Sequence, residues 1–376
     1  MSFVIRNFKA IGFTGSYVAA EIFVDSQGLI CETADENAQI IDCAGAWLSP
    51  GWADLHVHVW HGGTDISVRP GDAGLCRGVT AMADAGSSGE AAFHGLREYI
   101  IEPSPETIKA FVNIGSIGLV ACNRVSELTS INAIDIDRTL AVIEANRDVI
   151  CGIKVRAGKI IVGDLGIAPA LIAKRVAEIA GLPLMVHIGR PSPMVDEIFD
   201  LLTPGDIITH CFHGKSGGSV LDTPNIFSYA MKLADSGVHM DVGHGGDSFD
   251  FKTAETAIKK GLKPFSISTD IHLKNVNGPV FDMATTAAKL LAVGLTFEEV
   301  IDCITHNPRS FLNLESRQGL RVGQKADFTV FDLCDDDLKF TDSTGHTRIL
   351  EKMLEPRMTI LGPKMTPASR RSLQNP

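Results

Sequence analysis

Eight short apolar runs, each followed by a segment of helical character, constrain this chain more than any other feature. The runs occupy roughly residues 52–59, 79–85, 109–115, 149–155, 183–188, 206–211, 237–242 and 264–269. Amphipathic segments such as APALIAKRVAEIA and FKTAETAIKKG lie between them. Buried parallel strands read as continuous apolar runs, and parallel strands require crossover connections. The pattern therefore predicts eight β/α units and favours a closed α/β barrel, the (β/α)8 TIM barrel, over a doubly wound open sheet.

Strand-like sequence brackets this repeating region on both sides. Short alternating segments such as YVAAEIFVDSQG fill residues 1–50, and strand texture returns in KADFTVFDL and PRMTILG. Extra helices are expected over 281–292, 297–304 and 307–314. We predict a barrel over 51–317 and one small β-sandwich domain assembled from residues 1–50 and 318–362. Residues 363–376, rich in Pro, Ser and Arg, are expected to form a loose tail.

Composition excludes several classes of function. Asp plus Glu is 45 and Lys plus Arg is 34, a net charge of −11, which argues against binding to a nucleic-acid backbone. A run of eighteen uncharged apolar residues is missing from the sequence, so we expect no membrane span. The eight cysteines are scattered singly and the first residues lack the plan of a signal peptide. We therefore expect a cytoplasmic protein.

Two histidines at the end of the first run are the first candidate metal ligands. In PGWADLHVHVW, His56 and His58 are two residues apart, so both side chains share one face of a strand. Two imidazoles on one rigid strand make half of a metal site, and barrel active sites lie at this end of the strands. A chance pair of histidines is the alternative.

Four more polar residues each end a different predicted strand: Lys154, His187, His210 and Asp270. A lysine inside an apolar strand is costly, because an unpaired buried ammonium loses several kcal/mol. Taken singly, these residues have ordinary alternatives: a lysine reaching solvent, satisfied core histidines, and a helix N-cap at Asp270. Their convergence on one rim of the barrel favours a functional site.

This arrangement resembles the amidohydrolase superfamily, metal-dependent hydrolases built on a TIM barrel with a small β-sandwich from both chain ends. HxH after the first strand, Lys after the fourth, His after the fifth and sixth and Asp after the eighth carry the likeness. The phrases LSPGWADLHVH, THNPRSFLNL and VGQKADFTVFDL extend it over nearly the whole chain. The likeness is strongest to dihydroorotase-like or deacetylase-type members, some of which cleave acetylated hydroxy acids or N-acetyl amino acids.

The resemblance implies a metal-dependent hydrolase with two divalent ions. In such members the strand-four lysine, here Lys154, carries a CO2-derived carbamate that bridges the metals. The remaining ligands would be divided between the two ions, with His56, His58 and Asp270 on one and His187 and His210 on the other. This set suits Zn²⁺, and Fe²⁺, Mn²⁺ and Co²⁺ are compatible alternatives. Asp270 would serve as the catalytic base, taking a proton from a metal-bridging hydroxide and passing it to the leaving group.

The substrate is expected to be a small anionic acyl compound, an N-acetyl or O-acetyl carboxylate whose amide or ester bond is cleaved. Dihydroorotases carry an arginine where this chain has Trp60, which argues against that activity. The residues expected to contact substrate are Trp60, Arg156, Lys215, His244 and His272. A homo-oligomer is expected. The alternative functions are a cyclic-amide hydrolase of the dihydroorotase or hydantoinase type, a one-metal deaminase, which Lys154 disfavours, and a non-catalytic scaffold.

Overall fold

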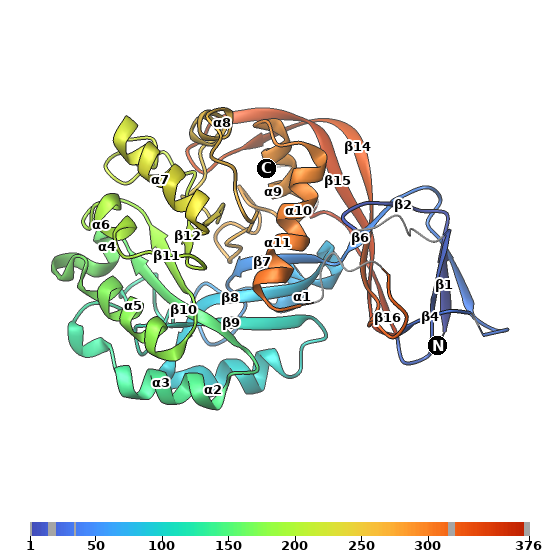
Figure 1. Cartoon of the computed structure of the whole chain (residues 1–376), viewed down its shortest axis with the longest axis horizontal. Coiled ribbons are helices and arrows are strands. Elements are labelled where there is room, and N and C mark those ends of the chain that lie inside the picture. Colours follow the sequence, from blue (N-terminus) through green and yellow to red (C-terminus); the bar gives the residue numbers. More distant parts are fainter. Residues whose placement is uncertain (1, 14–19, 34, 315–319, 372–376) are drawn as a thin grey trace.

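The computed structural model describes residues 2–13, 20–33, 35–314 and 320–371, and its largest element is a curled parallel sheet (Figure 1). Seven strands lie side by side in chain order within it. They are β7 (Trp52–Val57), β8 (Val79–Gly89), β9 (Thr107–Asn113), β10 (Ile150–Ala157), β11 (Leu184–Ile188), β12 (Ile207–Thr209) and β13 (His239–Asp241). Each strand falls on one of the first seven apolar runs. The α/β barrel predicted from these runs is confirmed.

The eighth run departs from the prediction, because residues 264–271 form two isolated bridges instead of a regular strand. Ser266 bridges Asp241 of β13, and Ile271 bridges Val57 of β7, so this segment links the two edge strands of the sheet. The side chains of Ser266 and Ser268 donate hydrogen bonds to the buried Asp241. Backbone hydrogen bonds to both sides, such as that from the N–H of Val242 to the carbonyl oxygen of Ser266, also hold the segment, and it closes the barrel without a continuous ladder.

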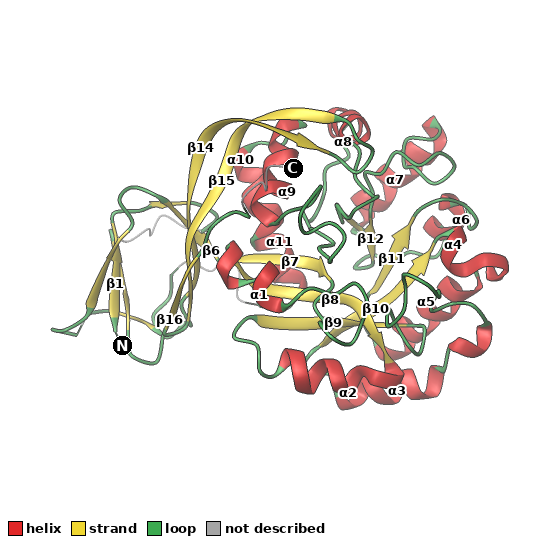
Figure 2. Ribbon diagram, turned by 180° about the vertical axis from the view of Figure 1, so that it is seen from behind, coloured by secondary structure: helices red, strands yellow, loops and turns green. Residues whose placement is uncertain are grey.

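Helices cover the outer side of the sheet (Figure 2). They are α1 (Pro70–Ala73), α2 (Phe93–Leu96), α3 (Ile136–Ala145), α4 (Lys159–Val162), α5 (Ala168–Ala180), α6 (Val195–Phe199), α7 (Pro224–Ser236), α8 (Phe251–Lys259), α9 (Met283–Ala292), α10 (Phe297–Ile304) and α11 (His306–Phe311). Several begin at side-chain caps, such as Asp135 before α3 and the Thr296–Glu299 capping box of α10. Among the described residues, no helix is long and apolar enough to cross a membrane.

The strand-rich ends of the chain form two small sheets beside the barrel. One has the order β4-β3-β1-β5 and the other β16-β15-β14-β6-β2. Their strands are β1 (Phe3–Arg6), β2 (Lys9–Ala10), β3 (Glu21–Val24), β4 (Ile30–Cys31), β5 (Gln39–Asp42), β6 (Trp47–Pro50), β14 (Asp327–Thr341), β15 (Thr347–Leu361) and β16 (Lys364–Pro367). A shared apolar core contains Phe3, Leu48, Phe328 and Ile360. Segments from both ends therefore build one small β domain. The expected boundary between residues 317 and 318 lies outside the described residues.

The segment after Gly362 is more ordered than the sequence suggests. Residues 364–367 form β16, which pairs with β15. Arg370 then makes an ion pair with Glu355, and the backbone N–H of Arg371 donates to Asp282. The expected loose tail is thus wrong as far as residue 371, because its arginines find carboxylate partners on the folded body. Residues 372–376 lie outside the described part of the chain.

The β14–β15 hairpin reaches from the small domain across to the barrel (Figure 1). Its far end packs on α9, where Phe340, Leu350 and Met353 enclose Ala288. Beyond this contact, the hydroxyl of Ser343 donates to the carbonyl oxygen of Gly245, which lies in the loop after β13. The small domain therefore helps to hold a loop at the carboxyl end of the barrel strands.

Candidate metal centre

His56 on β7 and His58 directly after it are buried and point to one carboxylate. Their Nε2 atoms lie 3.4 Å and 3.1 Å from Oδ1 of Asp270. At the opposite ring edge, Nδ1 of His56 lies 2.9 Å from the Thr209 hydroxyl, and Nδ1 of His58 lies 2.9 Å from the Ser87 hydroxyl. A partner at Nδ1 fixes the ring and leaves Nε2 free to bind a metal.

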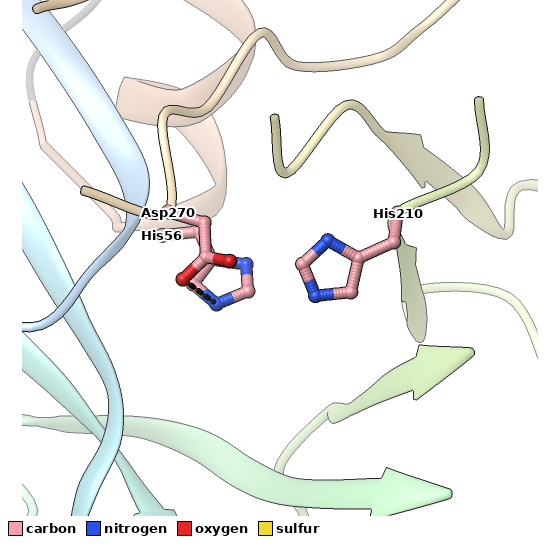
Figure 3. Close-up of side chains that lie close together, drawn as sticks. All are labelled: His56, His210 and Asp270. Carbon is pink, nitrogen blue, oxygen red and sulfur yellow. Dashed lines mark ion pairs between the residues drawn. The ribbon is translucent and has the colours of Figure 1, made fainter. Parts of the chain in front are cut away.

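His210 reaches the same place from the end of β12, opposite His56 and Asp270 (Figure 3). Its Nδ1 donates to the carbonyl oxygen of Gly243 at 2.6 Å, so the lone pair of this ring is on Nε2. That Nε2 is buried and has no hydrogen-bond partner among the residues that the structure describes. One ligand atom each from His56, His210 and Asp270 lie within 4.8 Å of one another. The orphaned Nε2 is the observation that best fits a bound cation at this point.

His187 on β11 completes the group of imidazoles. Its ring centroid lies 4.2 Å from that of His210. Burial holds the pKa of His56 and of His187 well below the usual range and lowers that of His210 to about 3. All three rings are therefore neutral near pH 7, which is the protonation state that metal binding requires.

Asp270 follows the bridging eighth run and has a left-handed backbone, with φ of 49°. Its N–H donates to the carbonyl oxygen of His56 at 2.7 Å, which ties it to β7. The pKa of the Asp270 carboxyl is held well below its usual range, although burial opposes its ionisation. A carboxylate is thus present beside the imidazoles.

Lys154 on β10 is 1% exposed and points into this cluster. Its Nζ lies 3.2 Å from Nε2 of His56 and 3.2 Å from Sδ of Met185. Burial lowers the pKa of the Lys154 amine to about 7. All six residues predicted as metal ligands are therefore brought together, and their donor set of imidazoles, a carboxylate and a near-neutral amine fits divalent cations.

A second layer of buried acids supports these residues, and the sequence reasoning missed it. Asp54 accepts hydrogen bonds from the hydroxyl and N–H of Thr269, and burial raises its pKa to about 7. Asp84 accepts from the N–H groups of Val59 and Ser87. Their positions in the sequence could have indicated these acids, because Asp54 shares the strand face of His56, and Asp241 lies at the end of the seventh run.

The glycines of HGGDS and its neighbours allow the loop after β13 to approach the centre closely. A Cβ at Gly243, where φ is +49°, would lie 2.2 Å from Oγ1 of Thr209. A Cβ at Gly245, where φ is +55°, would lie 2.5 Å from Oδ2 of Asp270. Both positions therefore require glycine, for backbone conformation and for space.

A cavity of about 530 Å³ opens from the cluster to the surface. Among the predicted substrate contacts, Arg156, Lys215 and His272 line it. Arg156 is bound at both ends of its guanidinium by Glu127, at 2.7 and 2.5 Å, and Lys215 pairs with Asp247 at 3.1 Å. Three further cations, which the sequence pattern does not indicate, also line this cavity: Lys159, Arg190 and Lys274.

Two predicted substrate contacts lie away from the cavity lining. Trp60 is 8% exposed, and the Cα of Gly63 packs so closely on its indole that a Cβ there would lie 2.1 Å from Cε2. His244 is fully buried, with its ring stacked on Phe249 at 4.7 Å. Packing of the barrel loops, which a sequence pattern does not specify, turns both rings inward.

His244 instead contacts a second buried lysine. Nζ of Lys289, on α9, lies 2.9 Å from Nε2 of His244, 2.6 Å from the carbonyl oxygen of Pro279 and 2.9 Å from that of Thr341. These acceptors belong to the loop after β13, the segment before α9 and the β14–β15 hairpin. Lys289 therefore fastens two mouth loops to the small domain.

Known proteins resemble this chain over almost its full length. A family described as a deacetylase-like composite domain matches residues 320–365. A deacetylase of Brucella anthropi is 51% identical over 374 residues, which cover 98% of this chain and 93% of that protein. This identity, over almost the whole of both chains, is high enough to place them in one family.

Solved structures agree with this result. A crystal structure described as a dihydroorotase superimposes with a TM-score of 0.95 at 48% identity, covering 100% of both chains. One described as an adenine deaminase superimposes with a TM-score of 0.88 at 33% identity, covering 97% of this chain and 99% of the other. The barrel and the small β domain are thus shared with these proteins.

Proposed function

Because this chain is a hydrolase of the amidohydrolase superfamily, belonging with its deacetylase-type members, we propose that it is a two-metal enzyme acting on a small anionic acyl compound. The bond cleaved is an amide or ester, as in an N-acetyl or O-acetyl carboxylate. The observation that carries the proposal is the convergence of four imidazoles, Asp270 and Lys154, five of which line one cavity while His210 lies beside them.

Lys154 supports a two-metal site through its environment. An amine with a pKa near 7 is partly neutral at physiological pH, so its nitrogen is able to attack CO2. A bond forms between Nζ and the carbon, a proton leaves, and a carbamate anion replaces a buried cation. We propose that two ions would be held here, one by His56, His58 and Asp270 and the other by His187 and His210, with the carbamate of Lys154 as a further ligand. Zn²⁺ is the expected metal.

When bound, the two ions supply a lowered pKa for water and a polarised substrate carbonyl. The chain's own contribution centres on Asp270, whose carboxylate lies beside His56 and His58. Asp270 accepts a proton from the attacking water and delivers it to the leaving nitrogen or oxygen. The hydrogen bonds at Nδ1 of His56, His58 and His210 keep these rings in place during the reaction.

The charge of the cavity supports an anionic substrate. Besides Lys154, five cationic side chains line it, of which Arg156 and Lys215 are paired with carboxylates and the other three, within the described residues, are not: Arg156, Lys159, Arg190, Lys215 and Lys274. Because low-dielectric walls focus such a field, an anion is attracted to the mouth. The protein as a whole has a net charge of −11, so this cavity is a local exception.

Hydrolysis of a cyclic amide is a second candidate, favoured by the likeness to the structure described as a dihydroorotase. Position 60 argues against it, since a buried Trp60 provides no cation beside the HxH strand. We expect kcat/KM for acyclic N-acetyl or O-acetyl carboxylates to exceed that for dihydroorotate. A higher value for dihydroorotate would reverse the order of the two candidates.

The decisive experiment combines metal analysis with a hydrolysis screen. Protein loaded with Zn²⁺ is assayed on N-acetyl amino acids, acetylated hydroxy acids, dihydroorotate and adenine. About two metals per chain and release of acetate are expected. One metal with release of ammonia from adenine would indicate a deaminase, and absence of metal would indicate a non-catalytic protein.

A further inference from the structure

Strands β10 and β11 end in the same way, with a glycine followed by a cation. Gly158 and Lys159 follow β10, and Gly189 and Arg190 follow β11. The strands are parallel, and their last paired residues are Ala157 and Ile188. Continuing this register places Lys159 opposite Arg190. The N–H of Lys159 donates to the carbonyl oxygen of Arg190 at 3.0 Å, so the two residues are neighbours.

Both cations line the cavity, and both differ from Arg156 and Lys215, which line it too. Arg156 is held by Glu127, and Lys215 by Asp247. In the part of the chain that the structure describes, neither Lys159 nor Arg190 has a carboxylate or hydrogen-bond partner for its side chain. Their charges are therefore available to a ligand.

The preceding glycines keep the path between these cations and the candidate metal centre open. Gly158 and Gly189 both line the cavity. A Cβ at Gly189 would lie 3.6 Å from Nε2 of His187, within van der Waals contact of a predicted metal ligand. A larger residue there would occupy the space through which a substrate reaches His187.

We propose that Lys159 and Arg190 form a carboxylate-binding pair, which holds the acid group of the substrate while its acyl carbonyl reaches the candidate metal centre. The proposal rests on the proposed function and adds to it the residues that recognise the anion. This pair takes the carboxylate-binding role in place of Arg156 and Lys215, whose charges are already balanced by Glu127 and Asp247. The substrate class is an acyl compound with a free carboxylate near the scissile bond.

The test compares an acid with its neutral counterpart. N-acetylalanine and N-acetylalaninamide differ in the carboxylate, and both are presented to metal-loaded wild type, Lys159→Met and Arg190→Met. We expect each variant to raise KM for the acid about 10-fold or more, the effect of losing one charge-assisted contact, with little change for the amide. The double variant should erase the preference for the acid.

Lys274→Met is the matched control, because it removes one positive charge from the lining of the same cavity. A smaller effect than that of Arg190→Met is expected, since only the general field is reduced. The proposed pair would be overturned if Lys274→Met raised KM for the acid as much as Arg190→Met does. It would also be overturned if Lys159→Met and Arg190→Met raised KM equally for the acid and the amide. Calorimetric binding of both compounds is measured in parallel. Selective binding of the acid without hydrolysis would overturn the function and leave the pair standing, whereas no selectivity would overturn the pair.

Discussion

The hydroxyl of Thr209 lies 2.9 Å from Nδ1 of His56. The same hydroxyl donates to Oδ2 of the buried Asp241 at 2.7 Å. Because its one proton is directed to the carboxylate, the oxygen accepts from Nδ1–H of His56. This chain of hydrogen bonds sets the tautomer of His56 and leaves its Nε2 lone pair facing Asp270 and Lys154.

Thr209→Val should weaken metal binding, because it removes the acceptor at Nδ1 and keeps the shape of the side chain. Losses of such supporting groups typically cost about 10- to 100-fold in metal affinity. Metal retained after dialysis against graded chelator measures the effect. Thr139→Val is the control, since the hydroxyl of this buried threonine on α3 donates to the carbonyl oxygen of Asp135, the N-cap residue of the same helix. Equal metal loss in both variants would contradict the role of Thr209.

Lys154→Met should abolish activity and leave less than the full metal content, because the bridging carbamate is not formed. Bicarbonate should speed metal reconstitution of wild type and have no effect on the variant. Lys289→Met is a stringent comparison, since burial also lowers the pKa of Lys289 to about 7. That variant should lose stability, from the acceptors it leaves unpaired, yet bind metal. A metal-loaded structure with a bare Lys154 amine would refute the carbamate.

Asp270→Asn should retain the fold and lower kcat by about 10² or more, as expected for loss of a general acid–base group. The amide has the shape of the carboxylate but does not accept and return a proton. Initial rates at saturating substrate, with metal content measured on the same samples, give the result. Near-normal kcat with full metal occupancy would remove Asp270 from proton transfer.

Glu255→Gln should reduce the acid sensitivity of the protein. Hydrogen bonds from Arg348 on the hairpin and from Lys259 lower the pKa of Glu255 to about 2 from 4.5. Since the folded-state pKa is the lower one, the stabilisation is complete above pH 4.5 and is lost as the pH falls toward 2. The pair is partly exposed, so we expect about 0.5–1 kcal/mol.

Urea unfolding between pH 6 and pH 3 measures the difference between wild type and Glu255→Gln. The two curves should converge as the pH falls. Glu144→Gln is a matched control, because its pair with Arg147 lies on the barrel surface at α3 and does not join the hairpin to the barrel. Curves that stay parallel would show that Glu255 adds no pH-dependent stability.

The sequence alone determined the barrel and where its polar residues end the strands. Period and length of the apolar runs reflect local rules, and parallel strands in a barrel necessarily align their carboxyl ends at one rim. His56, Lys154, His187 and Asp270 were singled out for that reason, and the structure brings them together. The prediction departed from the structure in two places. The eighth run forms isolated bridges instead of the predicted strand, and the segment after Gly362 is paired with β15 instead of forming a loose tail.

Tertiary structure decided which polar side chains face the cavity and which charges are neutralised by partners within the protein. Glu127 neutralises Arg156 and Lys289 binds His244, each through a partner brought close by packing. Partners of this kind are chosen by three-dimensional proximity and desolvation. These depend on the whole assembled core and leave no periodic signal in the sequence around either residue.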